Sequence, residues 1–360
     1  MESKQYYPDE FPRNQWYVAA RTAEIGQELF PRWLLGEPVV LYRTEDGQPV
    51  ALADRCPHRQ YPLSRGLRVG DEIECGYHGL VFNAEGRCVS VPQQDHIPDH
   101  LRARAYPLRE RAGLIWIWMG DPARADDSLI PDHSFMASEG WVTVSGTLHM
   151  KARAQLMNEN LLDLSHLTYL HPTTLGTRQV AYVPAEATWD ERRVCVERVM
   201  KNIEPPGFFV RAMGLEGQID RTQLAEFIAP GFHITHVSAK PAGDDDDSRL
   251  SQHKVVHGIT PETRTTTFYF WAMARDYRID DPEITSFAQD AQARVFSDDV
   301  EACEAIERVL AAYEPGAPTQ TNIKVDAGPL QSRRIIERML ADERQGTAEP
   351  TRQGAVASVS

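Results

Sequence analysis

The chain has 360 residues, of which 42% are apolar and 25% charged, and its formal net charge is −14. This length suffices for two domains with separate cores. The acidic balance argues against nucleic acid or an anionic membrane as the main partner, because both bind basic surfaces. No apolar run approaches the roughly eighteen residues that cross a bilayer, and residues 1–10 are polar, so we expect a cytoplasmic protein with no membrane partner.

Short apolar runs separated by turn residues make up the first third of the chain. They lie at residues 16–20, 38–42, 50–53, 79–82 and 114–118. Between the second and third runs, Glu45-Asp46-Gly47 is typical of a β-hairpin turn. Several strands at such spacing predict a small all-β domain, which we assign to residues 13–122.

Two segments of this domain each offer one thiolate and one imidazole. Cys56-Pro-His58 is followed, after sixteen residues, by Cys75-Gly-Tyr-His78. In one class of [2Fe–2S] centre, two cysteines hold one iron and two histidines hold the other. Structural zinc takes the same ligand types, but its common motifs keep the cysteines together and the histidines together. The mixed halves therefore favour an iron–sulfur cluster over a Cys2His2 zinc site.

Beyond this domain, Gly, Pro and charged residues at 120–132 mark a domain boundary. A strand is predicted at 141–150 and a helix at about 154–169. Further strands are predicted around 180–190, 193–203, 207–214, 222–229, 231–240, 251–260 and 264–275. Helices are predicted at 282–313 and 331–343, before a tail at 346–360 that we expect to be disordered. Consecutive strands followed by a long helix predict an α+β domain over 138–345, with an antiparallel sheet wrapped over the helix.

The predicted helix at 154–169 leads into a pair of histidines. His166 and His171 are five residues apart, which is about 140° on an ideal helix, so both cannot face one point on an undistorted helix. Pro172 disfavours the helical conformation at His171. We therefore expect the helix to end near Tyr169 and to bring the two imidazoles together, although two histidines alone are weak evidence of a metal site.

The predicted helix at 282–313 carries one carboxylate within its apolar stripe. The stripe consists of Val295, Asp299, Cys303, Ile306 and Leu310. A buried ionised carboxylate needs a partner, either a metal ion or a buried arginine, whereas Asp298 is expected on the polar side. With His166 and His171, Asp299 would form a triad of two histidines and one carboxylate, which leaves open positions on Fe(II) for oxygen chemistry.

Cys56-Pro-His58-Arg and Cys75-Gly-Tyr-His78-Gly resemble the motif of the Rieske non-haem iron oxygenases. The Asp-x-x-His-x4-His pattern at 163–171, with an aspartate on a late helix, resembles the iron site of the same family. The order of segments is most similar to the oxygenase components of vanillate and dicamba O-demethylases, over about residues 12–340. The resemblance implies a helix-grip second domain, a [2Fe–2S] Rieske cluster and a mononuclear Fe(II).

The resemblance also implies a role for Asp163, three residues before the first iron histidine. Asp163 would join His166 to His78 of a neighbouring subunit and carry electrons between them, which implies a homotrimer. The alternative is a surface residue or a group that makes hydrogen bonds within the helix. Asn160, one turn earlier, would support the iron ligands or have no role. His257 could donate a hydrogen bond to an anionic substrate, and a core histidine is an equal possibility.

The activity that the resemblance implies is that of a terminal oxygenase. Electrons from NADH would arrive through a separate reductase or ferredoxin, because the sequence has no glycine motif for flavin or nicotinamide. O2 would be used to O-demethylate a small methoxylated aromatic compound, and hydroxylation of a ring or side chain, or N-demethylation, is the alternative. Pure electron transfer would leave the second domain unexplained, and a ligand-binding module with structural zinc would be colourless. The sequence assigns no role to the acidic residues 244–247.

Overall fold

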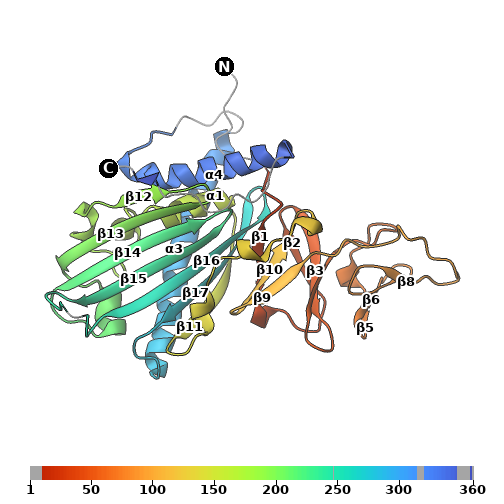
Figure 1. The fold of residues 1–360 in the computed structure, drawn as a ribbon, viewed down its shortest axis with the longest axis horizontal. Helices are drawn as coiled ribbons and strands as arrows, with labels where there is room; N and C mark the ends of the chain where they lie inside the picture. The colour runs from red at the N-terminus through yellow and green to blue at the C-terminus, as the bar shows by residue number, and fades with distance from the viewer. Residues whose placement is uncertain (1–9, 246, 314–319, 347–356, 359–360) are drawn as a thin grey trace, which may run out of the picture. The chain divides into compact units, whose positions relative to one another are not determined.

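A computed structural model describes residues 10–245, 247–313, 320–346 and 357–358 (Figure 1). The chain forms two compact units. One comprises residues 13–130 with 260–263, and the other comprises residues 131–259 and 264 onwards together with the residues before 13. Most of the predicted disordered tail lies outside the described residues. No helix in the described part of the chain is long and apolar enough to cross a membrane.

The first unit is built from strands alone, apart from short 3-10 turns, which confirms the predicted all-β domain. Its strands are β1 (Trp16–Arg21), β2 (Phe30–Leu34), β3 (Glu37–Arg43), β4 (Pro49–Ala53), β5 (Leu67–Val69), β6 (Glu72–Glu74), β7 (Val81–Phe82), β8 (Cys88–Ser90), β9 (Leu108–Arg111) and β10 (Leu114–Trp118). They form three antiparallel sheets in the orders β1-β10-β9, β2-β3-β4 and β5-β6-β7-β8. Val40, Leu52 and Phe82 are fully buried in a core cluster that also contains Cys56 and Cys75.

The second unit is built on one eight-stranded antiparallel sheet. Its strands are β11 (Val142–Met150), β12 (Glu186–Trp189), β13 (Arg193–Ile203), β14 (Ile219–Ile228), β15 (Phe232–Pro241), β16 (Ser251–Thr263), β17 (Thr266–Arg275) and β18 (Ala357–Ser358). Their order in the sheet is β11-β17-β16-β15-β14-β13-β12-β18. Its helices are α1 (Ala154–Leu162), α2 (Leu167–Leu170), α3 (Pro282–Tyr313) and α4 (Ala327–Arg344).

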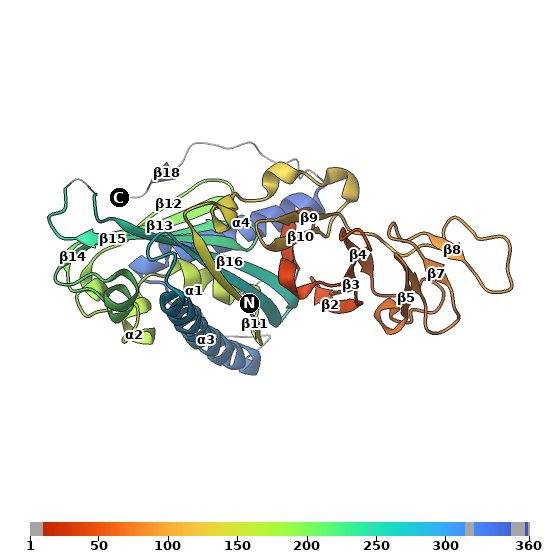
Figure 2. The ribbon, with the colours of Figure 1, turned by 90° about the horizontal axis from the view of Figure 1, so that it is seen from below.

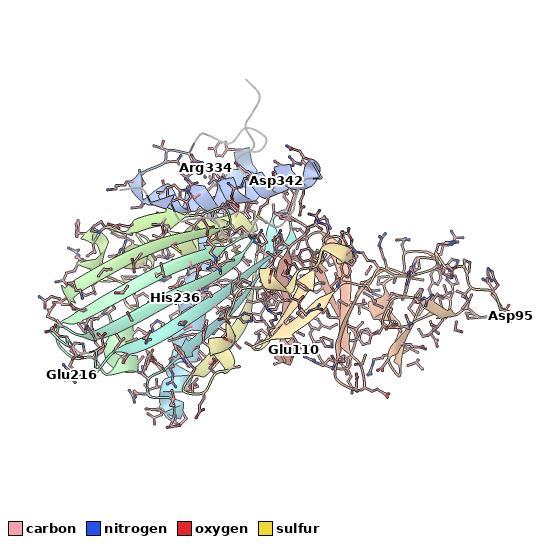
Figure 3. All side chains as sticks on the ribbon, viewed as in Figure 1. Asp95, Glu110, Glu216, His236, Arg334 and Asp342 are labelled. Carbon is pink, nitrogen blue, oxygen red and sulfur yellow. The ribbon has the colours of Figure 1, made fainter. Side chains whose placement is uncertain are left out.

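The long helices of this unit cover one face of the sheet, with α3 lying behind the strands in Figure 1 and beneath them in Figure 2. On α3, Phe296 packs against Trp271 of β17, with ring centroids 5.3 Å apart. On α4, Ile335 shares an apolar cluster with Val196 of β13. Neighbouring residues alternate between the faces, so His236 of β15, labelled in Figure 3, is half-buried while Val237 joins the core. The α+β fold predicted from the sequence is confirmed.

Two of the predicted strands are wrong or too long. Residues 207–214 form a π-helical turn (Phe209–Met213) in place of a strand. Pro205 and Pro206 precede it, and it ends at Gly214, whose φ of +71° suits glycine. The burial of Phe209, Ala212 and Met213 follows helical spacing. The strand predicted at 180–190 begins only at Glu186, after a 3-10 turn at Val180–Tyr182.

The helix predicted at 154–169 is broken. It ends at Leu162, Asp163 adopts an extended conformation with φ −92° and ψ 92°, and the chain resumes as α2. The helix predicted at 331–343 begins earlier, at Ala327. The helix predicted at 282–313 is confirmed. Within it Ile306 is 45% exposed, which contradicts its predicted place in the apolar stripe.

Candidate active site

Two loops of the first unit present the predicted cluster ligands on similar turns. The loop after β4 carries Cys56, and the loop after β6 carries Cys75. Gln60 donates its backbone N–H to the Cys56 carbonyl at 2.8 Å, and Gly79 does the same to the Cys75 carbonyl at 2.9 Å. Both donors have positive φ, +59° at Gln60 and +72° at Gly79. The same backbone turn therefore holds each pair of ligands.

The four cluster side chains divide into a buried pair and an exposed pair. The Cys56 and Cys75 side chains are buried and lie within hydrogen-bonding reach of each other. Burial, with the Cys75 thiol beside it, raises the pKa of Cys56 to about 11, so a thiolate here calls for a bound cation. His58 and His78 are exposed, with ring centroids 4.6 Å apart. This arrangement fits a [2Fe–2S] cluster with an inner and an outer iron.

The second unit brings His166, His171 and Asp299 together. One ligand atom from each lies within 4.8 Å of the others. Asp299 Oδ1 is 3.0 Å from His171 Nε2 and 3.5 Å from His166 Nε2. His171 and Asp299 are buried, and His166 is half-buried. Two imidazoles and a carboxylate on one side of a pocket suit an iron with open positions.

The break between α1 and α2 creates the histidine geometry. Asp163 Oδ1 accepts hydrogen bonds from the backbone N–H and the hydroxyl of Ser165, at 2.7 and 2.6 Å. This local turn leads into α2, with His166 immediately before its first residue and His171 immediately after its last. The helix end expected from Pro172 is present, and the break at Asp163 was not expected. The two imidazole centroids lie 5.4 Å apart.

Burial and charge act differently on the two histidines of the triad. Burial lowers the pKa of His166, so its imidazole is neutral and free to bind a cation. Burial also acts to lower the pKa of His171, but the contact with Asp299 outweighs it, and the net shift is upward. Asp298, as predicted, is the more exposed of the two aspartates, although one of its oxygens lies 3.5 Å from His171 Nδ1.

The triad lines a pocket enclosed by the sheet, α1, α2 and α3. Its apolar wall is formed by Leu161, Leu164, Leu167, Leu175, Val237, Val255, Val295 and Phe296. Its polar residues, besides the triad, are Arg221, Gln223, Thr235, His253, His257 and Gln292. A pocket that combines an apolar wall with convergent polar groups is the usual form of a small-molecule site.

His257 lies in this pocket, as the substrate-binding hypothesis requires, but both its ring nitrogens have neighbours. Nδ1 is 2.7 Å from the Tyr269 hydroxyl and Nε2 is 3.3 Å from the Thr235 hydroxyl. Burial lowers the pKa of His257 to about 3, so the ring is neutral. The side-chain oxygen of Asn160 is buried and, within the described residues, has no hydrogen-bond partner.

Sequence reasoning missed Arg221, Gln223 and Gln292. The signal for the first two was present, because Ile219, Arg221, Gln223, Ala225 and Phe227 alternate along β14. These five side chains share the buried face of the strand. The predicted strand at 222–229 began one residue too late to include Arg221.

Asp163 is half-buried. Burial lowers the pKa of the His166 ring, and the smaller effect of the Asp163 charge raises it. His166 Nδ1 is buried and makes no hydrogen bond within the described part of the chain. A metal-bound imidazole normally donates its second N–H to a carboxylate or a carbonyl. The role expected for Asp163 therefore remains a prediction.

Two family models match parts of the chain, one in each unit. A Rieske [2Fe-2S] domain model matches residues 15–103, and a vanillate O-demethylase oxygenase C-terminal domain model matches residues 150–342. The chain is 38% identical to a putative toluene-4-sulfonate monooxygenase system iron-sulfur subunit of Comamonas testosteroni, covering 93% of this chain and 99% of the relative. It is 35% identical to a vanillate O-demethylase oxygenase subunit of Pseudomonas sp. (strain HR199 / DSM 7063), covering 93% and 96%.

The fold agrees with a crystal structure of dicamba monooxygenase with non-haem iron and dicamba. The two match with a TM-score of 0.82 at 31% identity, covering 94% of this chain and 99% of the other. The donor sets described above fit a [2Fe–2S] cluster in the first unit and a mononuclear iron in the second. The chain belongs to the Rieske non-haem iron oxygenases, as an oxygenase component similar to those of the vanillate and dicamba O-demethylases.

Proposed function

We propose that this oxygenase component O-demethylates a small methoxylated aromatic compound in the pocket beside His166, His171 and Asp299. The observation that carries the proposal is that this triad lines an otherwise largely apolar pocket. His166, His171 and Asp299 would hold an iron whose chemistry is the activation of O2, with reducing equivalents supplied by NADH through the reductase. One O2, one NADH and one proton would convert the methyl ether into a phenol, formaldehyde, water and NAD⁺.

The residues around the triad would hold the substrate and keep stray water out. Leu161, Val255 and Phe296 provide apolar surface for an aromatic ring. His257 and Tyr269 form a buried polar pair next to this wall. These side chains would fix the ring so that its methyl carbon faces the triad, because productive geometry accounts for much of the rate in such sites.

The test is oxygen uptake with formaldehyde detection, using the complete oxygenase, a surrogate reductase, NADH and a panel of methoxylated benzoates and phenols. Formaldehyde formed in step with NADH loss supports O-demethylation. Oxygen uptake coupled to an aromatic product that retains all its carbon atoms would overturn O-demethylation and identify a hydroxylase.

Hydroxylation of an aryl methyl group is the second candidate. The observation that favours it is the 38% identity to a putative toluene-4-sulfonate monooxygenase subunit, beside 35% and 37% to two vanillate O-demethylase subunits. The same pocket would present a methyl carbon in either reaction. Product mass separates the two, since hydroxylation gives a benzylic alcohol without formaldehyde.

We also propose that the enzyme works as a homotrimer in the cytoplasm, with Asp163 joining His166 to His78 of a neighbouring copy. The support is that Asp163 is half-buried next to His166, whose Nδ1 has no hydrogen-bond partner among the described residues. A reducing compartment would keep Cys56 and Cys75 available to iron. Light scattering of the holoenzyme at three times the mass of one chain would support the trimer, and a monomeric mass would overturn it.

A further inference from the structure

Arg221 is a buried cation in the wall of the pocket that the triad lines. Its exposure is only 2%, and it lies on the inward face of β14 with Gln223. Burial, followed by repulsion from Arg198, lowers the pKa of Arg221 to about 9. The side chain therefore stays a cation at neutral pH. An isolated charge in such a place is costly unless something neutralises it.

The protein satisfies only part of this guanidinium, and with neutral groups. Nη1 donates to the Leu175 carbonyl at 2.9 Å, and Nη2 donates to the Gln223 side-chain oxygen at 2.7 Å. The planar group lies 4.4 Å from the Phe209 ring centroid. Nε is buried and has no hydrogen-bond partner within the described residues. A guanidinium has five N–H donors, so capacity for an anion remains.

Another buried arginine of the same unit, Arg153, is neutralised by a carboxylate of the protein itself. Arg153 is 7% exposed, and Glu307 neutralises it through two hydrogen bonds of 2.7 Å. Among the described residues, Arg221 forms no ion pair, and the charged neighbour that acts on it is the like-charged Arg198. An anion bound in the pocket would supply the negative charge that balances Arg221.

We propose that Arg221 binds the anionic substituent of the substrate, a carboxylate or sulfonate on the aromatic ring, while the methyl carbon faces the triad. This inference rests on the proposed function and narrows it to anionic aromatic substrates. Gln223 would hold the guanidinium in place through their 2.7 Å hydrogen bond. Arginine suits this role because its planar donors match the oxygens of such anions.

The neighbouring polar residues support an anion at Arg221 better than at His257. Both His257 ring nitrogens already have neighbours in Tyr269 and Thr235. His253 is buried beside Arg221, and burial, aided by the Arg221 charge, lowers the pKa of His253 to about 3. A neutral imidazole can donate one hydrogen bond, but Arg221 is the formal positive charge among the residues that line this pocket.

A purely structural role for Arg221 is the alternative to be tested, since it also holds the Leu175 carbonyl and packs on Phe209. The probes are 4-methoxybenzoate, 4-methoxybenzenesulfonate and the neutral 4-methoxybenzamide. Their dissociation constants are measured by calorimetry on the holoenzyme, without turnover. Wild type is compared with Arg221→Met, Arg221→Lys and the control Arg193→Met, which removes one charge from an exposed position on β13.

We expect wild type to bind at least one of the two anions about 10-fold or more tightly than the amide, and Arg221→Met to weaken that binding by roughly 10–100-fold, the range of a lost charge-assisted hydrogen bond. The amide should bind Arg221→Met as it binds wild type. Arg221→Lys should retain part of the preference, and Arg193→Met should retain all of it. The ratio between benzoate and sulfonate distinguishes the two kinds of anion.

The proposal is overturned if wild type does not prefer either anion, a result that needs no variant to fold. It is also overturned if Arg221→Met loses the anions and the amide equally, because this would indicate a structural role. The experiment distinguishes failure of the anion site from failure of the proposed reaction. Arg221-dependent binding of an anion that is never oxidised would contradict the proposed reaction and leave the anion site standing, whereas equal binding and demethylation of all three probes would do the reverse.

Discussion

Glu307 of α3 accepts two hydrogen bonds from the guanidinium of Arg153, each 2.7 Å long. It accepts a third, at 3.1 Å, from the backbone N–H of Arg153. Arg153 immediately precedes α1, whose end leads to the triad histidines, and Glu307 lies two turns beyond Asp299. This buried ion pair fixes the start of α1 to the helix that carries Asp299. The ion pair also explains why Glu307 is buried on α3 while its neighbour Ile306 is exposed.

The variant Glu307→Ala should be strongly destabilised, because it removes the carboxylate that accepts three hydrogen bonds from the buried Arg153. Loss of one member of a buried pair costs about 3–5 kcal/mol. Urea unfolding followed by tryptophan fluorescence measures the change, with Glu301→Ala, at an exposed position of the same helix, as the control. A cost below about 1 kcal/mol, the range of exposed pairs, would contradict this role.

A second stability prediction concerns Gly146 of β11, which pairs with Trp271 of β17. A Cβ at this position would lie 2.5 Å from the Trp271 ring. The ring is 2% exposed and packs on Phe296, so it has little room to yield. We expect Gly146→Ala to lower the free energy of unfolding by about 1–3 kcal/mol, the usual cost of overpacking. The control Gly26→Ala has no atom within 4 Å of the added Cβ and no positive φ, so it isolates the effect of crowding. Thermal unfolding measures the change, and a melting temperature of Gly146→Ala equal to that of wild type would contradict the predicted crowding.

The sequence predicted the α+β architecture because strand and helix periodicities are strong over long segments. It also predicted the residues that form the triad, since Pro172 and the single carboxylate in the α3 stripe leave few alternatives. It failed where tertiary contacts override local pattern. Residues 207–214 carry apolar runs compatible with either state. Ile306 is exposed because the next residue, Glu307, faces inward to form the ion pair with Arg153.

The pocket was the least predictable part of the site. Arg221 looks like any charged strand residue until its inward register and its neutral partners are known. The break at Asp163 depends on hydrogen bonds with Ser165 that no periodicity reveals. The break at Asp163 is a local departure from regular structure, and such departures concentrate at functional sites.

Asp299→Ala should remove the mononuclear iron and leave the cluster intact. Asp299 Oδ1 lies 3.0 and 3.5 Å from the two imidazoles, and its side chain is buried. The matched variant Asp298→Ala, at the half-exposed neighbour, should retain the iron. Elemental analysis reports total iron, and the visible spectrum of the cluster reports the other site. If Asp298→Ala loses iron and Asp299→Ala does not, the ligand has been assigned to the wrong aspartate.

Asp163→Asn should retain both iron sites but lower turnover by roughly 10–100-fold or more, the usual effect of losing a carboxylate partner of a metal-bound imidazole. Asparagine keeps a side-chain oxygen that can accept the two Ser165 hydrogen bonds, so the turn that starts α2 should survive. The negative charge that acts on His166 is lost. Rapid mixing of the reduced variant with O2 and substrate measures how quickly the cluster reoxidises. Slow reoxidation with normal substrate affinity supports electron transfer through Asp163, whereas wild-type turnover in Asp163→Asn would rule out the bridging role.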